Sequence, residues 1–250
     1  MRFGMIMVLV GFMLCDLQAQ PNYDHFKARV DYFKSSIGKG KNVADLDILN
    51  AAKGLSDSIF QTKYFDLQGD ILMTIGRINQ QLGKMGNAEI YYKQGIAKGR
   101  KYNDSLWVAN ACGRLGNFYA LEERNLLALD YHLKALNLRE VHDRSRKSIA
   151  DTYHNIASVY IQLNNLTTAE DYLKKSLKLK NELKDTFYLG IITTLFADIY
   201  SQRGEYQKAE EHYLKDIPKR LHQNNYEGLT ISFLGLADNY KAWGKTDDAE

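Results

Sequence analysis

The feature that most constrains the fold of this chain is a residue pattern that recurs about every forty positions. Each copy has an apolar residue, then a small one, and then, three positions on, usually an aromatic residue. A fixed period of this size is the sequence signature of a repeat protein. The five small residues stand at positions 76, 116, 157, 197 and 237, so the steps between copies are 40, 41, 40 and 40 residues.

The second half of each copy carries a matching pattern. An alanine follows each small residue by twelve positions, and a larger residue stands four positions after that alanine. Turn residues such as Asn164-Asn165 and Gly204-Glu205 separate the two halves. Because residues three and four apart share one helix face, each copy predicts a hairpin of two helices of about 17 residues. One hairpin cannot bury its apolar surface alone, so neighbouring hairpins must stack.

Helix-start residues recur at the same period. Side chains of Asp and Asn accept hydrogen bonds from the free N–H groups of a first helical turn. We expect this role for Asp104, Asp143, Asp185 and Asn225.

The pattern resembles the tetratricopeptide repeat (TPR), lengthened from about 34 to about 40 residues. Residues 151–179 and 195–213 match best, and the resemblance covers residues 61–250. It implies an all-α fold, a right-handed superhelix (α-solenoid) of TPR-like helical hairpins. The chain departs from the family at the early tryptophan, where Cys112 and Tyr153 stand, and it lacks the closing proline. Helices that run on into the next turn would make that proline unnecessary.

The repeat divides the chain into segments. Residues 21–60 show two helical stripes and are expected to form a divergent hairpin that caps the array. The predicted units of the array are 61–101, 102–141, 142–183, 184–223 and an incomplete 224–250. Because the chain ends one residue after Ala249, which opens a second helix, we expect further repeats, with or without an effector domain, beyond residue 250.

Residues 1–20 have the shape of a secretory signal peptide. Arg2 precedes an uncharged apolar run from Phe3 to Leu14, which is too short for a comfortable membrane span. An uncleaved anchor and a lipid anchor on Cys15 remain alternatives, although Leu14 is a poor lipobox residue. We therefore expect an exported protein, periplasmic or associated with the cell envelope. In the mature chain Cys112 cannot form an internal disulfide and is expected to fill a helix interface.

The residues that carry chemistry do not assemble into a recognisable active site. The net charge is +3, so no global field favours nucleic acid. There is no H-E-x-x-H, C-x-x-C, Walker or G-x-S-x-G motif. His132 and His212 fall near packing stripes and are expected to be structural. We predict no catalysis, cofactor or metal for residues 1–250, and leave open a kinase in a longer chain.

The resemblance implies a binding surface, because first helices line the concave face of TPR arrays and partners lie along it. An asparagine amide at position 117 would bind a peptide backbone, and Arg77 and Arg114 would clamp a carboxylate. A solvated groove without a dedicated ligand remains the alternative, since the full basic set of carboxylate-clamp TPRs is not reproduced. The candidate residues are Arg77, Arg114, Asn117, His154, Asn155, Ser158, Asp198 and Asp238.

These observations favour a non-enzymatic scaffold that binds a protein or peptide in an exported compartment. Exported arrays of this kind are similar to the sensor regions of bacterial signalling proteins. There, a transmembrane helix and a histidine kinase or DNA-binding domain follow the array. A cell-envelope assembly lipoprotein is a third possibility, and the poor lipobox counts against it.

Overall fold

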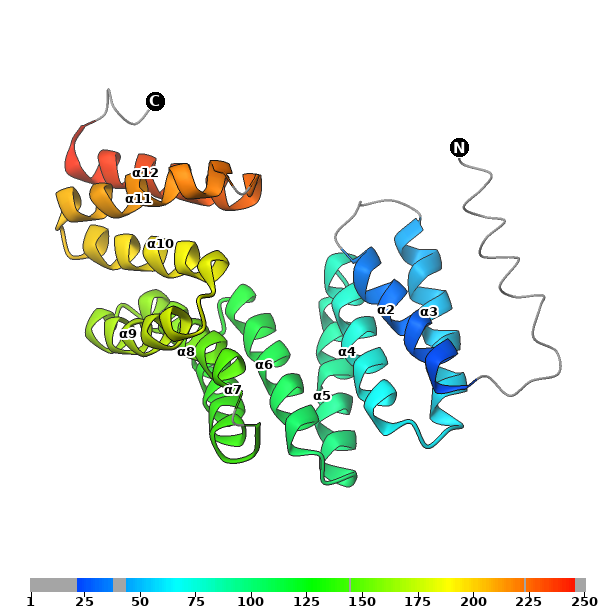
Figure 1. Ribbon diagram of the computed structural model, residues 1–250. Coiled ribbons are helices and arrows are strands. Elements are labelled where there is room, and N and C mark those ends of the chain that lie inside the picture. Colours follow the sequence, from blue (N-terminus) through cyan, green and yellow to red (C-terminus); the bar gives the residue numbers. More distant parts are fainter. Residues whose placement is uncertain (1–21, 38–43, 144, 223, 246–250) are drawn as a thin grey trace. The chain divides into compact units, whose positions relative to one another are not determined.

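The computed structural model describes residues 22–37, 44–143, 145–222 and 224–245, which contain helices and no strand (Figure 1). They divide into two compact units, Met1–Tyr102 and Asn103–Glu250, each of which is described by itself. The predicted signal peptide and Ala249 lie outside the described residues. The all-α fold class is confirmed.

The described residues of the first unit form the helices α2 (Tyr23–Ser36), α3 (Ala44–Phe60), α4 (Phe65–Gln81) and α5 (Met85–Lys101). Helix α4 packs against the other three. Its Ile71 and Ile75 are buried against Val30 of α2 and Leu55 of α3 in one apolar core. The stripes expected in residues 22–60 therefore pack on the first repeat helix.

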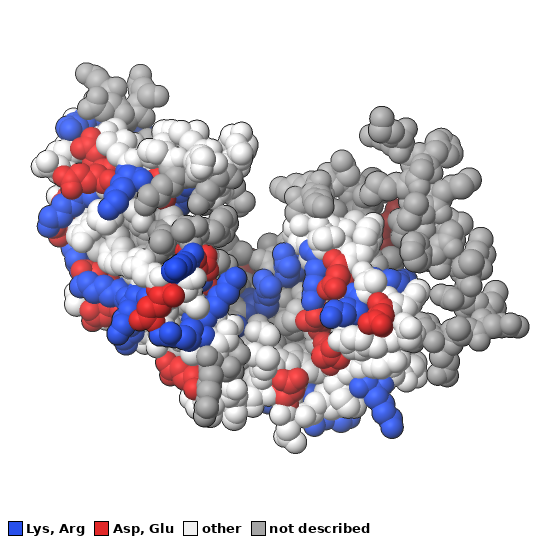
Figure 2. Space-filling model, viewed as in Figure 1, with Lys and Arg blue, Asp and Glu red and all other residues white. Residues whose placement is uncertain are grey.

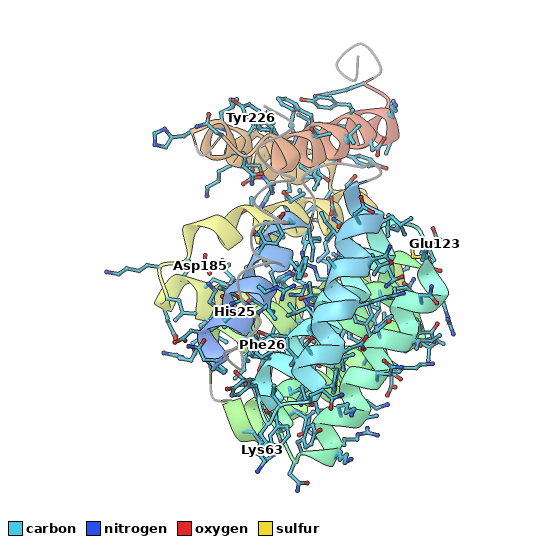
Figure 3. All side chains as sticks on the ribbon, turned by 90° about the vertical axis from the view of Figure 1, so that its right-hand side faces the viewer. His25, Phe26, Lys63, Glu123, Asp185 and Tyr226 are labelled. Atoms are coloured by element: carbon cyan, nitrogen blue, oxygen red, sulfur yellow. The ribbon has the colours of Figure 1, made fainter. Side chains whose placement is uncertain are left out.

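The second unit alternates first and second helices of successive hairpins, which pack in pairs: α6 on α7, α8 on α9 and α10 on α11, with α12 on α11. Figure 3 shows Glu123, in a turn within a hairpin, on one side, and Asp185, in a turn between hairpins, on the other. The elements are α6 (Ser105–Leu121), α7 (Asn125–Leu138), the π-helical turn η1 (Arg139–Asp143), α8 (Arg146–Gln162), α9 (Leu166–Glu182), α10 (Thr186–Gln202), α11 (Tyr206–His222) and α12 (Tyr226–Trp243).

The small residue of each copy permits close approach of the two helices, as its position predicts. A Cβ atom added at Gly76 would lie 2.5 Å from Cε1 of Tyr92, and one at Gly116 would lie 2.7 Å from Cε1 of His132. Both rings are buried and belong to the second helix of the same hairpin. The glycines are therefore required by packing rather than by backbone conformation.

We expect the substitution Gly76→Ala to lower the free energy of unfolding by up to about 2 kcal/mol, measured by urea titration. Overpacking costs about 1–3 kcal/mol, whereas alanine gains about 1 kcal/mol over glycine in a helix. Gly86→Ala is the control, because no atom lies within 4 Å of a Cβ added at this exposed helical position. An equal response of the two variants would contradict the packing explanation.

Two of the four predicted helix-start residues cap their helices. The Asp104 carboxylate accepts from the N–H of Trp107 at 2.8 Å, and the Asn225 side chain accepts from the N–H of Gly228 at 3.0 Å. The prediction for Asp143 was wrong, because η1 extends to that residue and Ser145 caps α8 instead. Asp185 precedes α10 but makes no side-chain capping bond.

Basic residues recur at one register near the ends of the second helices. Arg139, Lys180 and Arg220 each stand 23 positions after the small residue of their copy, near the ends of α7, α9 and α11. Lys180 and Arg220 are buried, and Arg139 is partly buried. Polar bonds from these cations, rather than a proline, hold the end of each second helix against its neighbours.

The bonds made by these cations join different helices. Arg139 donates to Thr152 of α8 and, at 3.1 Å, to Asn110 of α6. Lys180 donates to Asp151 of α8 and, at 3.0 Å, to Asp185 at the start of α10. Asp185 is thus engaged by an ammonium group, which explains why its side chain does not cap α10.

Candidate protein-binding surface

Seven of the eight candidate residues lie in the second unit, on the first helices α6, α8, α10 and α12. Consecutive first helices pack side by side, α6 on α8, α8 on α10 and α10 on α12. Equivalent repeat positions therefore form a row across the four helices: Asn117, Ser158, Asp198 and Asp238. Arg77, on α4 of the first unit, is half-buried and is not placed relative to this row.

Helix α6 presents an exposed stripe that includes two candidates. Asn110, Arg114, Asn117 and Leu121 follow one another at spacings of four, three and four residues, and all are exposed. The Asn110 oxygen accepts from Nη2 of Arg139 at 3.1 Å, which fixes one end of the stripe. Amide, guanidinium and apolar groups on one face suit a peptide segment with a carboxylate. We call these four residues the α6 stripe.

The candidates on α8 are less accessible than those on α6. His154, Asn155 and Ser158 are each half-buried. Burial lowers the pKa of His154 to about 4, while the charge of Asp151 raises it and that of Lys180 lowers it. His154 is therefore neutral at physiological pH and offers a ligand a neutral imidazole rather than a charge.

The two carboxylates of the row differ in their surroundings. Asp198 on α10 is half-buried, burial raises its pKa, and its carboxylate accepts from the hydroxyl of Tyr213 at 2.5 Å. Asp238 on α12 is exposed. Asp198 thus serves the packing of its own hairpin, whereas Asp238 is open to a partner.

Apolar side chains beside the row were missed in the sequence. Ile231 and Leu234, with 53% and 61% of their surface exposed, precede Asp238 by seven and four residues and so lie on its helix face. Leu121 of the α6 stripe is 71% exposed. Helical spacing from the candidates is the signal that would have identified them. The surface therefore offers an apolar contact at α6.

The histidine at the aromatic position of the second copy makes stability depend on pH. His132 is buried, and its pKa falls to about 4, chiefly through burial and then through the charges of His154 and Arg139. Because the folded pKa lies below the ordinary value of about 6.5, stability is full above pH 6.5 and is lost as the pH falls towards 4.

Between pH 7 and pH 5, the free energy of unfolding of the natural chain should fall by about 2 kcal/mol more than that of His132→Phe. Urea titration at both pH values measures the difference. Phenylalanine keeps an aromatic ring where Tyr92 and Tyr213 stand in other copies. His142→Phe is the control, since His142 is exposed. An unchanged pH dependence in His132→Phe would contradict the assignment of a buried neutral imidazole.

Other site types are not seen in the described residues. Basic and acidic side chains intermix on the face drawn in Figure 2, without a large patch of one sign. No group of three or more His, Cys, Asp or Glu residues suited to a metal ion occurs in the described ranges. None of the described helices is long and apolar enough to cross a membrane. Cys112 is buried on α6, as its predicted packing role requires.

Helical hairpins of similar length that stack on one another, with small residues where the two helices of a hairpin meet, define an α-helical repeat protein. Two models of the tetratricopeptide repeat match this sequence, one at residues 104–182 and 148–215 and the other at residues 69–97. Together these matches cover more than half of the 250 residues. The chain belongs to the tetratricopeptide repeat family.

Similar proteins differ in length and context. The 43 kDa receptor-associated protein of the synapse from Gallus gallus is 25% identical over 154 residues, which are 61% of this chain and 37% of that protein. The chain thus spans little more than a third of this curated relative.

Solved structures share the fold at low identity. One is a signal transduction ATPase with a tetratricopeptide repeat sensor from Pyrococcus horikoshii, with a TM-score of 0.73 and 19% identity over 90% of this chain and 34% of that one. Another is a Rap protein in complex with Competence and Sporulation Factor, with a TM-score of 0.70 and 15% identity over 96% of this chain and 66% of that one.

Proposed function

We propose that this chain is a scaffold that binds a protein or peptide segment across the first helices of its second unit. The observation that carries the proposal is the row of equivalent positions on α6, α8, α10 and α12, with the α6 stripe at one end and Asp238 at the other. Tetratricopeptide repeats are interaction scaffolds, and the described residues of this chain place exposed polar and apolar side chains together on that surface.

The charges of the α6 stripe and of the row favour one direction for a bound segment. Arg114 provides a guanidinium at α6, and Asp238 provides an exposed carboxylate at α12. A segment with an acidic group near α6 and a basic group near α12 complements both. Leu121 would contact an apolar side chain of that segment. Neutral His154 and the hydroxyl of Ser158 would supply hydrogen bonds between the two charged ends.

We propose further that the array is the exported interaction region of a longer bacterial protein. The amino-terminal residues have the composition of a signal peptide, and the chain covers only 34% of the similar ATPase that carries a repeat sensor. In this proposal the longer protein is a membrane-bound sensor histidine kinase or a DNA-binding regulator. An apolar stretch of about 20 residues in the coding sequence beyond residue 250 would support the membrane-bound form.

The binding surface is tested by affinity capture with a paired substitution. Arg114→Glu with Asn117→Leu changes two exposed residues of the α6 stripe, and Lys134→Glu with Asn137→Leu makes the same change on exposed positions of α7. We expect a partner retained by the natural protein and the α7 variant to be lost from the α6 variant, with all three equally folded by circular dichroism. Equal recovery of the same partners by both variants would reject this surface.

The proposed export is tested separately by cell fractionation and amino-terminal sequencing. We expect the mature chain in the periplasm or cell envelope with its first twenty residues removed. A soluble cytoplasmic species with an intact Met1 would contradict export and leave the binding surface untouched.

A further inference from the structure

A groove with a basic rim separates α3 from α5 in the first unit. Both helices pack on α4, and among the described residues no backbone contact joins α3 directly to α5. The space between them measures about 710 Å³ and is open to solvent. Its volume lies in the range of about 300–1,000 Å³ that is typical of ligand sites.

The floor of the groove is apolar. Leu72 and Ile75 of α4 belong to the buried core and line the groove together with the half-buried rings of Phe60 and Tyr91. Burial and the charge of Asp57 raise the pKa of Tyr91, so its hydroxyl stays protonated and can donate a hydrogen bond. An apolar side chain in the groove would therefore meet aromatic and aliphatic surface beside a neutral donor.

The rim of the groove carries an excess of positive charge. Lys53 stands on α3, and Lys98 and Lys101 stand one turn apart on α5, against the single carboxylate of Asp57, so three cations and one anion leave a net charge of +2. No ion pair to any of these four residues is present in the described parts of the chain. Cations in a last helical turn also offset the helix dipole, but that role does not require them to border a groove.

Lys98 is held at the groove rather than extended into solvent. Its Nζ lies 4.7 Å from the centre of the Phe60 ring, which is a cation–π contact across the two helices. The side chain is half-buried. An ammonium group fixed beside an apolar floor favours a ligand that combines a carboxylate with a large apolar side chain.

We propose that this groove binds an acidic segment of a partner protein, with a large apolar side chain on the floor and carboxylates at Lys98 and Lys101. The open shape fits a peptide laid between two helices, because small-molecule sites usually enclose most of their ligand. The groove belongs to the first unit and uses none of the candidate residues of the second. This second surface is therefore independent of the proposed function.

The test begins with selection of random twelve-residue peptides displayed on phage against the purified chain. We expect the selected peptides to contain at least two acidic residues beside a large apolar one. Their Kd is then measured by fluorescence anisotropy with synthetic peptides. We expect Lys98→Glu with Lys101→Glu to weaken binding by about tenfold or more, since two attractive ion pairs become repulsive.

Two further variants make the result specific to the groove. Ala97→Trp keeps every charge and fills the space from an exposed lining position, so it should also weaken binding by about tenfold. Lys93→Glu with Arg100→Glu makes the same charge change on α5 at positions that do not line the groove, and should leave the Kd within about twofold. Circular dichroism is used to check that each variant is folded.

The outcomes separate this proposal from the proposed function. The selected peptides should bind the Arg114→Glu, Asn117→Leu variant with an unchanged Kd, because that variant alters only the second unit. Selection of neutral or basic peptides, failure to select any peptide, or a Kd that the groove variants leave unchanged would each overturn the proposal.

Discussion

Replacing Arg220 by methionine should lower the free energy of unfolding by about 3–5 kcal/mol, which is the cost of leaving a buried charge unpaired. Asp216 is fully buried and accepts from Nε of Arg220 on the same helix. Its carboxylate also accepts from Ser232 of α12 at 3.0 Å, and Arg220 donates to Thr194 of α10 at 2.9 Å. The pair thus connects three helices, and its loss should appear in urea titration followed by circular dichroism.

A double substitution distinguishes the cost of an unpaired charge from the cost of lost packing. Asp216→Leu with Arg220→Met removes both charges and keeps apolar volume, so it should lose clearly less stability than Arg220→Met alone. If the double variant is as unstable as the single one, packing rather than charge pairing explains the loss.

Replacing Lys180 by methionine should cost about 2–3 kcal/mol. The Lys180 side chain has no exposed surface, whereas those of its partners Asp151 and Asp185 keep 28% and 17%. Because water reaches both carboxylates, the penalty should be smaller than at Arg220. Urea titration measures the loss, and hydrogen exchange should show it as reduced protection in α8 and α9.

Lys174→Met on the same helix is the matched control for Lys180→Met. Lys174 is exposed and pairs with Glu170 one turn away, an arrangement worth about 0.3–0.5 kcal/mol. Losses of equal size for the two lysines would contradict the view that the buried ion pairs of Lys180 stabilise the array.

The helices were predictable because the packing that forms them is local and repeated. Small residues such as Gly76 and Gly116, with their aromatic or histidine partners sixteen residues later, mark both helices of a hairpin in one register. Helix caps were predictable only in part. Asp104 caps its helix, but Asp185 is drawn to a lysine that is near in space.

The cations near the ends of the second helices were not predicted, although their signal is present in the sequence. Arg139, Lys180 and Arg220 recur at one register, but a charged residue is expected on the surface unless its partners are known. The bond from Tyr213 to Asp198 likewise depends on the distance between two helices. It makes Asp198, a candidate ligand contact, also a residue that stabilises its own hairpin.

The basic groove was also not predictable, because it depends on how the helices pack and not on the repeat pattern. Lys53 and Lys98 lie 45 positions apart, and nothing in the repeat pattern places them on opposite sides of one space. Their helices become neighbours of the groove only because each packs on α4.

The most direct test of the binding row is site-specific photo-crosslinking in the native cell. A photoreactive phenylalanine derivative is placed at Asn117 or Asp238 in the row, or at Leu133 or Leu214, which are exposed on second helices. We predict crosslinks to one common protein or peptide from both row positions and none to it from the second helices. Crosslinks to that partner from Leu133 and Leu214 alone would contradict binding across the first helices.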